Sequence, residues 1–101
     1  MNGGPKKVFD SKDTLSRQEL AELLETLAER IRSGTITLSS STTTNQVELQ
    51  LPESLTLEMQ VEDSVKRSGT KRELELEIRW AVQDDGTPVE QPGPDRGFRI
   101  S

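Results

Sequence analysis

The segment Glu73–Trp80 constrains the fold more than any other part of the chain, because it alternates strictly between charged and apolar residues. It reads Glu-Leu-Glu-Leu-Glu-Ile-Arg-Trp and ends in the only Trp of the protein. A period of two is the side-chain repeat of a β-strand, whose successive side chains point to opposite faces of the sheet. We therefore predict a strand from about 72 to 80 with one apolar face and one charged face.

Four further segments have strand character, and a short polar stretch separates most of them. Alternation predicts strands at 35–38, 46–51 and 55–62, and a short first strand is predicted at 8–13. A Ser/Thr/Asn turn is predicted at 39–45, and Pro52 should end the strand before it, because proline lacks a backbone N–H donor. Polar residues around Ser68 and Gly69 should turn the chain into the final strand.

One amphipathic helix is predicted from about Arg17 to Arg32. Its start has the pattern of a capping box, in which the Ser16 hydroxyl and the Glu19 side chain satisfy each other's backbone N–H groups. Leucine and isoleucine then recur every three or four residues, which places them on one face. Gly34 is suited to the left-handed residue that ends a helix.

These elements predict an α+β fold. One apolar helix face and one apolar sheet face suggest a two-layer sandwich, with the helix on an antiparallel sheet of four to five strands in the order β-α-β-β-β-β. We predict a domain at 8–80 between disordered tails at 1–7 and 81–101. The predicted core consists of Leu20, Leu23, Leu24, Leu27, Ile31, Ile36, Leu38, Val47, Leu49, Leu51, Leu55, Leu57, Met59, Val61, Leu74, Leu76, Ile78 and Trp80.

The composition argues against several classes of function. Cys, His and Tyr are absent from all 101 residues, which removes thiolate chemistry and the commonest general acid–base and metal ligand. We therefore expect no enzyme and no cofactor. The net charge of −5 disfavours non-specific binding to nucleic acids and anionic membranes. No apolar run is long enough to span a bilayer, so we expect a soluble, cytoplasmic protein without membrane contact.

The chain resembles the amphi-Trp domain family of small proteins, which is named for an amphipathic terminal strand that ends in Trp. The resemblance rests on the capped helix, the alternating strands and the Glu-Leu-Glu-Leu-Glu-Ile-Arg-Trp ending, and it covers about Val8 to Trp80. It supports the α+β fold and implies no catalytic or binding residue.

The polar face of the sheet is the first candidate site, with Glu58, Glu73, Glu75, Glu77 and Arg79 as its partner-binding residues. If Leu57 pairs with Ile78, Glu58 lies opposite Glu77 and Glu62 lies opposite Glu73. A register shifted by two residues would instead bring Glu58 to Arg79. Uncompensated acids remain in either case, so this face is either a surface for a basic protein partner or a solvated face that opposes aggregation.

The alternative site is the basic turn, with Lys66, Arg67, Lys71 and Arg72 as contacts for nucleic acid. No aromatic residues interleave with these cations, although a stacking platform for single strands requires them. An open sheet edge would also allow a homodimer. Phe98 and Ile100 are large apolar residues in the predicted tail and form either a docking motif or part of a loose end.

Overall fold

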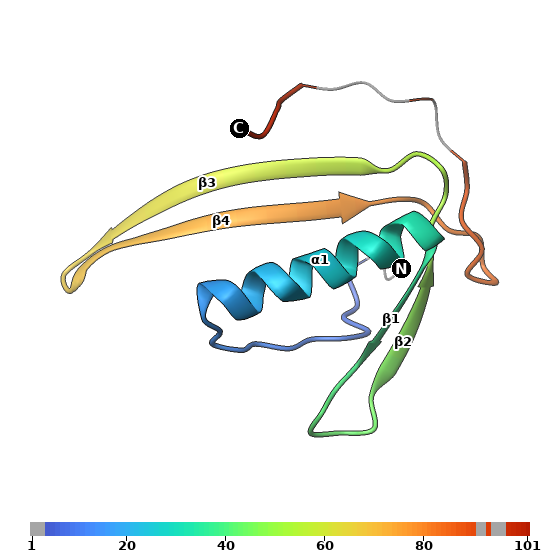
Figure 1. Cartoon of the computed structure of the whole chain (residues 1–101), viewed down its shortest axis with the longest axis horizontal. Coiled ribbons are helices and arrows are strands. Elements are labelled where there is room, and N and C mark those ends of the chain that lie inside the picture. Colours follow the sequence, from blue (N-terminus) through green and yellow to red (C-terminus); the bar gives the residue numbers. More distant parts are fainter. Residues whose placement is uncertain (1–3, 91–92, 94–96) are drawn as a thin grey trace. The chain divides into compact units, whose positions relative to one another are not determined.

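The computed structural model describes residues 4–90, 93 and 97–101. Residues 1–3 of the predicted N-terminal tail, and 91–92 and 94–96 of the C-terminal one, lie outside the described residues. Within the described part, the elements are α1 (Arg17–Ser33), β1 (Thr35–Ser39), β2 (Gln46–Gln50), β3 (Thr56–Lys66) and β4 (Gly69–Arg79) (Figure 1). The α+β class is confirmed. The chain divides into two compact units, Met1–Leu51 and Pro52–Ser101.

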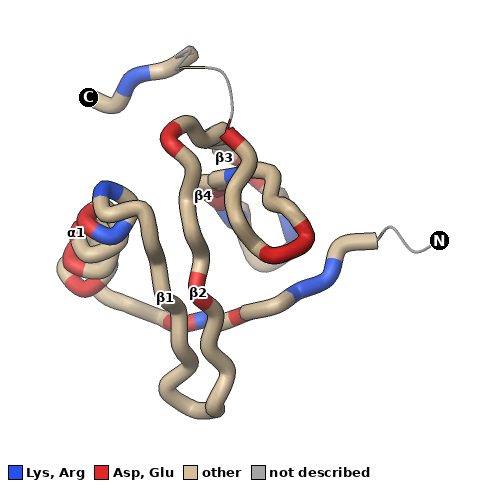
Figure 2. Tube along the Cα trace, turned by 90° about the vertical axis from the view of Figure 1, so that its right-hand side faces the viewer, with Lys and Arg blue, Asp and Glu red and all other residues tan. Residues whose placement is uncertain are grey.

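Helix α1 begins and ends as the sequence predicts. The Ser16 hydroxyl accepts a hydrogen bond from the Glu19 amide at 3.0 Å, and the Glu19 carboxylate accepts one from the Ser16 amide at 2.9 Å. These bonds to Ser16 lower the pKa of the Glu19 carboxyl group. Arg30 and Arg32 lie in the last turn, at the end that leads into β1, where positive charge complements the helix dipole (Figure 2).

The first hairpin is short and is joined directly to the helix. Gly34 adopts a φ of 89° at the end of α1, a left-handed conformation that favours glycine. β1 pairs antiparallel with β2, with Ile36 opposite Leu49, and the Leu51 amide donates to the Gly34 carbonyl at 2.9 Å. Helix α1 packs against β1, and Ile36 is the one buried hydrophobic side chain among the described residues, with 8% exposure.

The second hairpin is longer, with eleven residues in each of β3 and β4. Arg67 and Ser68 form its tight turn, and Gly69, with a φ of 131°, begins β4. The turn is shorter than the predicted one, so each strand extends further towards it than predicted. Of the two registers considered from the sequence, the one that pairs Leu57 with Ile78 forms.

Two predictions about the sheet are wrong. No strand forms at 8–13, and within this segment only Phe9 is half-buried. The described strands also form two separate two-stranded sheets, β1–β2 and β3–β4, instead of one. Alternation identifies strands but does not say which of them pair, and β2 already ends at Gln50, just before Pro52.

The predicted core is largely wrong as well. Seven of its members are half-buried, and the apolar residues of the β3–β4 hairpin and of the first half of α1 are exposed. The exposed members are Leu20, Leu23, Leu24, Leu38, Leu57, Met59, Val61, Leu74, Leu76 and Ile78. No helix within the described part of the chain is long and apolar enough to cross a membrane.

Residues 81–90, which the sequence places in a tail, make a tight turn. Its backbone bonds include Val89 to Ala81 at 2.9 Å and Gln83 to Thr87 at 2.8 Å. The Asp85 carboxylate accepts hydrogen bonds from the Thr87 hydroxyl and amide, which lower the pKa of Asp85. The Glu90 carboxylate also accepts a bond from the Glu53 amide at 3.0 Å, which ties the turn to the start of its unit.

Candidate functional site: the acidic face of the β3–β4 hairpin

The β3–β4 hairpin has one face with five glutamates. Strand alternation places Glu58 and Glu62 of β3 on the same face as Glu73, Glu75 and Glu77 of β4. The register sets Glu58 opposite Glu77 and Glu62 opposite Glu73, so two like-charge pairs lie directly across the ladder. Such pairs oppose strand pairing by a few tenths of a kcal/mol, roughly. We call these five residues and Arg79 the acidic face.

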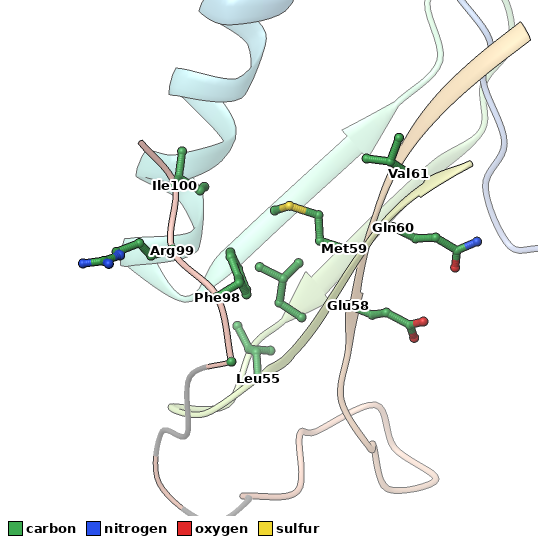
Figure 3. Close-up of a pocket in the computed structure, with 10 residues that line it drawn as sticks. Leu55, Glu58, Met59, Gln60, Val61, Phe98, Arg99 and Ile100 are labelled. Carbon is green, nitrogen blue, oxygen red and sulfur yellow. The ribbon is translucent and has the colours of Figure 1, made fainter. Parts of the chain in front are cut away.

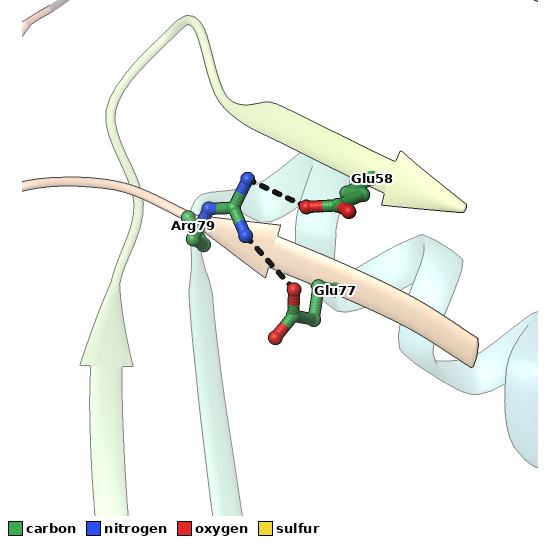
Figure 4. A network of polar contacts seen from close by, with 3 residues as sticks. All are labelled: Glu58, Glu77 and Arg79. Atoms are coloured by element: carbon green, nitrogen blue, oxygen red, sulfur yellow. Dashed lines mark hydrogen bonds and ion pairs between the residues drawn. The ribbon is translucent and has the colours of Figure 1, made fainter. Parts of the chain in front are cut away.

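Arg79 offsets part of the negative charge at one end of the acidic face. Its guanidinium donates to Glu77 Oε1 at 2.8 Å and to Glu58 Oε1 at 3.0 Å, so a single cation bridges the like-charge pair (Figure 4). The Cα partner of Arg79 is Thr56, and Glu58 is its diagonal neighbour. The contact predicted only for a shifted register therefore forms in the unshifted one. Arginine reaches the diagonal position because its side chain is long.

The other end of the acidic face has no ion pair among the described residues, although Lys66 and Lys71 lie on the same side of the hairpin. Glu62, Glu73 and Glu75 form no ion pair with any described residue. Glu75 faces Gln60 across the ladder, and Glu62 faces Glu73. The structure thus divides the predicted site into a partly neutralised region around Arg79 and a region of three carboxylates without an ion pair. Glu62 was not among the predicted site residues, although the same alternation places it on this face.

The basic turn does not bring four free cations together. Arg72 lies on the opposite, apolar face, where its guanidinium makes two hydrogen bonds to the Asp63 carboxylate, at 2.7 and 2.9 Å. The guanidinium lowers the pKa of the Asp63 carboxyl group, and the carboxylate raises the pKa of Arg72. Lys66 and Lys71 lie on the acidic side of the hairpin, while Arg67 belongs to the turn itself. The predicted nucleic-acid contacts are therefore divided between both faces.

The acidic face is suited to binding across a surface. Its side chains project from neighbouring positions of a flat ladder, which spreads their charges instead of enclosing a ligand. Among the residues that the structure describes, no group of three or more acidic side chains could hold a metal ion. A flat array of carboxylates attracts lysine and arginine side chains of another protein, and its field accelerates their encounter.

Trp80 follows β4 directly and differs from the apolar residues before it. Its side chain is half-buried, whereas Leu76 and Ile78 are exposed. The indole Nε1 is buried and has no hydrogen-bond partner among the described residues. A buried indole N–H usually finds a partner, so this position is unfavourable for the polar end of the Trp80 side chain.

In a comparison with known families, the chain matches the Amphi-Trp domain over residues 3–101. The chain belongs to this family. The match extends beyond the stretch from Val8 to Trp80 on which the sequence resemblance rests, and it includes the C-terminal residues after β4. Comparison with curated proteins and with solved structures gives no match.

Proposed function

We propose that this member of the Amphi-Trp domain family is a non-catalytic interaction module that binds a basic protein partner through the acidic face. The observation that carries the proposal is the uncompensated group of Glu62, Glu73 and Glu75. Two of these three are opposed across the ladder, where they weaken strand pairing. A basic partner would remove that repulsion and gain three ion pairs.

The geometry of the hairpin supports this assignment. The three carboxylates lie on regular strands, so the ladder fixes the spacing of their backbone positions before a partner arrives. The Arg79 bridge at one end marks the boundary of the negative region, because it occupies Glu58 and Glu77. The expected contact is therefore centred on Glu73 and Glu75, with lysine or arginine side chains of the partner above them.

The test is a pull-down from native lysate with the full chain as bait, followed by titration of the captured protein. The variant carries Glu73→Lys and Glu75→Lys, and the matched control carries Glu25→Lys and Glu29→Lys on the helix. Each pair changes the net charge from −5 to about −1, so bulk charge is the same in both. Circular dichroism confirms that all three baits are folded.

The expected result is a protein that binds the wild type and the helix variant but binds the hairpin variant at least roughly tenfold more weakly. Wild-type binding should also weaken as salt rises from about 0.05 to 0.3 M, because exposed charges are screened. Equal binding by the hairpin variant would contradict the proposal. The bait could instead capture nucleic acid. If that capture is lost when Lys66 and Lys71 are changed to Ala, the hairpin binds nucleic acid and not a basic protein.

A further inference from the structure

The second face of the same hairpin carries a separate feature. Leu57, Met59 and Val61 alternate with the acidic residues along β3, so they point to the opposite side, and Leu55 precedes them. Together with the chain end, they line an open groove of about 970 Å³, within the Pro52–Ser101 unit. This space remains open with residues 97–100 in place.

The other wall of the groove is the C-terminal segment itself. Gly97, Phe98, Arg99 and Ile100 line the groove opposite β3. The segment is neither helical nor paired in a sheet, and its sequence alternates between apolar and charged residues. An extended chain with this pattern sends Phe98 and Ile100 to one side and Arg99 to the other.

Phe98 is the anchor of this arrangement. Figure 3 shows Phe98 on the side of the segment that faces Leu55 and Met59, while Arg99 points away from β3. Phe98 is 41% exposed, whereas Ile100 is 80% exposed, so the aromatic ring is the better covered of the two. Aromatic side chains supply large apolar contact area, and methionine sulfur next to an aromatic ring adds to it.

We propose that the apolar face of β3 is a docking groove for a short extended segment with an apolar-charged-apolar pattern, and that residues 97–101 are its resident occupant. The segment binds within its own chain and can be displaced, because Phe98 is only partly covered and Ile100 is largely exposed. The inference rests on the apolar residues of β3, whereas the proposed function rests on Glu62, Glu73 and Glu75, although Glu58 and Gln60 also border the groove.

Met59 provides a direct readout of the groove. Its oxidation to the sulfoxide by dilute hydrogen peroxide depends on access to the sulfur, and the only other methionine is Met1. Partial burial of one Phe favours the docked over the free segment by roughly five to one. Removing that contact should raise the oxidation rate of Met59 about threefold, because the open fraction rises from about one sixth to about one half.

The experiment compares Phe98→Ala with Arg99→Ala in the full chain and measures the oxidation rate of Met59 by mass spectrometry. The expected result is faster oxidation in Phe98→Ala, an unchanged rate in Arg99→Ala, and partial restoration of protection in Phe98→Leu. Equal rates in the Phe98→Ala and Arg99→Ala proteins would overturn the proposal. If the oxidation rate of Met59 in the wild type falls as the protein concentration rises, the segment binds the groove of a second copy, which would overturn docking within one chain.

A second measurement uses a synthetic peptide with the sequence of residues 97–101. Added to the Phe98→Ala protein at roughly 10 mM, above the effective concentration of a short tether, it should restore the protection of Met59. A control peptide with Ala in place of Phe should not. Equal protection by both peptides, or by neither, would contradict a groove that recognises the aromatic ring.

Discussion

The two hairpins have the same antiparallel geometry but differ in how they are covered. In β1–β2, helix α1 packs against β1, Ile36 is 8% exposed, and Val47 and Leu49 are half-buried. In β3–β4, the corresponding apolar face remains accessible, with Val61 at 62% and Leu74 at 64% exposure. The short hairpin thus contributes to a core, whereas the long one presents two open faces.

This difference indicates where the chain can bind another molecule. Isolated two-stranded hairpins are marginally stable, and exposed apolar patches mark interaction sites on soluble proteins. β3–β4 combines such a patch with the uncompensated acids of the acidic face. Within its own unit, both faces of β3–β4 are therefore accessible, whereas in the other unit α1 contacts β1.

The largest expected effect is a difference in how much stability the protein loses when an apolar side chain is removed from each hairpin. Ile36→Ala removes the one buried hydrophobic side chain of the described residues and should lower the free energy of unfolding by about 3 kcal/mol. Leu74→Ala removes a comparable side chain from an exposed position and should change it by only about 0.5 kcal/mol. Urea denaturation measures both. Equal losses would show that β3–β4 is covered in solution and would remove the contrast.

A smaller effect is expected at the joint between α1 and β1. Gly34 has a φ of 89°, and no atom lies within 4 Å of the position that a Cβ would occupy. Gly34→Ala should therefore cost about 1 kcal/mol through backbone strain alone. Gly4→Ala, at an open position without a positive φ, is the matched control and should be neutral. Thermal unfolding monitored by circular dichroism compares the two. A neutral Gly34→Ala would mean that the joint is not held in this conformation.

The smallest expected effect is a dependence on pH in β3–β4. Arg72 lowers the pKa of Asp63 in the folded state, so the ion pair stabilises the protein above the ordinary carboxyl range, roughly pH 4. That contribution is lost as the pH falls through the lowered pKa of the folded protein. The difference in unfolding free energy between wild type and Asp63→Ala should therefore be small at pH 7 and should disappear in stronger acid. A difference that grows on acidification would contradict the pairing.

The helix and the four strands that form were predictable from the sequence because they follow from local patterns. The capping box and Gly34 define α1, and the prediction of Arg17 to Arg32 differs from the structure by one residue. Alternation in β3 and β4 excludes a register shift of one residue, which would turn the apolar set to the charged face, but it does not distinguish the observed pairing of Leu57 with Ile78 from a shift of two residues. From the same alternation, the membership of Glu58, Glu73, Glu75 and Glu77 in one face could be predicted.

The sheet arrangement and the ion pairs could not be predicted in this way. Period-two patterns are identical for one four-stranded sheet and for two hairpins, so the alternation does not indicate that the sheet is divided after β2. Asp63 and Arg72 lie on the apolar face near the turn, where the alternation has already ended, so their pairing depends on the length of the turn. The bridge from Arg79 to Glu58 depends on side-chain reach across a diagonal, which residue spacing alone does not determine.

The most direct test of the contrast between the hairpins is carbene photolabelling of the wild-type chain, with mass spectrometry to locate the label. The account predicts strong labelling at Val61 and Leu74 and weak labelling at Ile36, with a difference of several-fold that follows their exposures of 62%, 64% and 8%. Labelling at Val61 and Leu74 as weak as that at Ile36 would contradict it, because the long hairpin would then be covered like the short one.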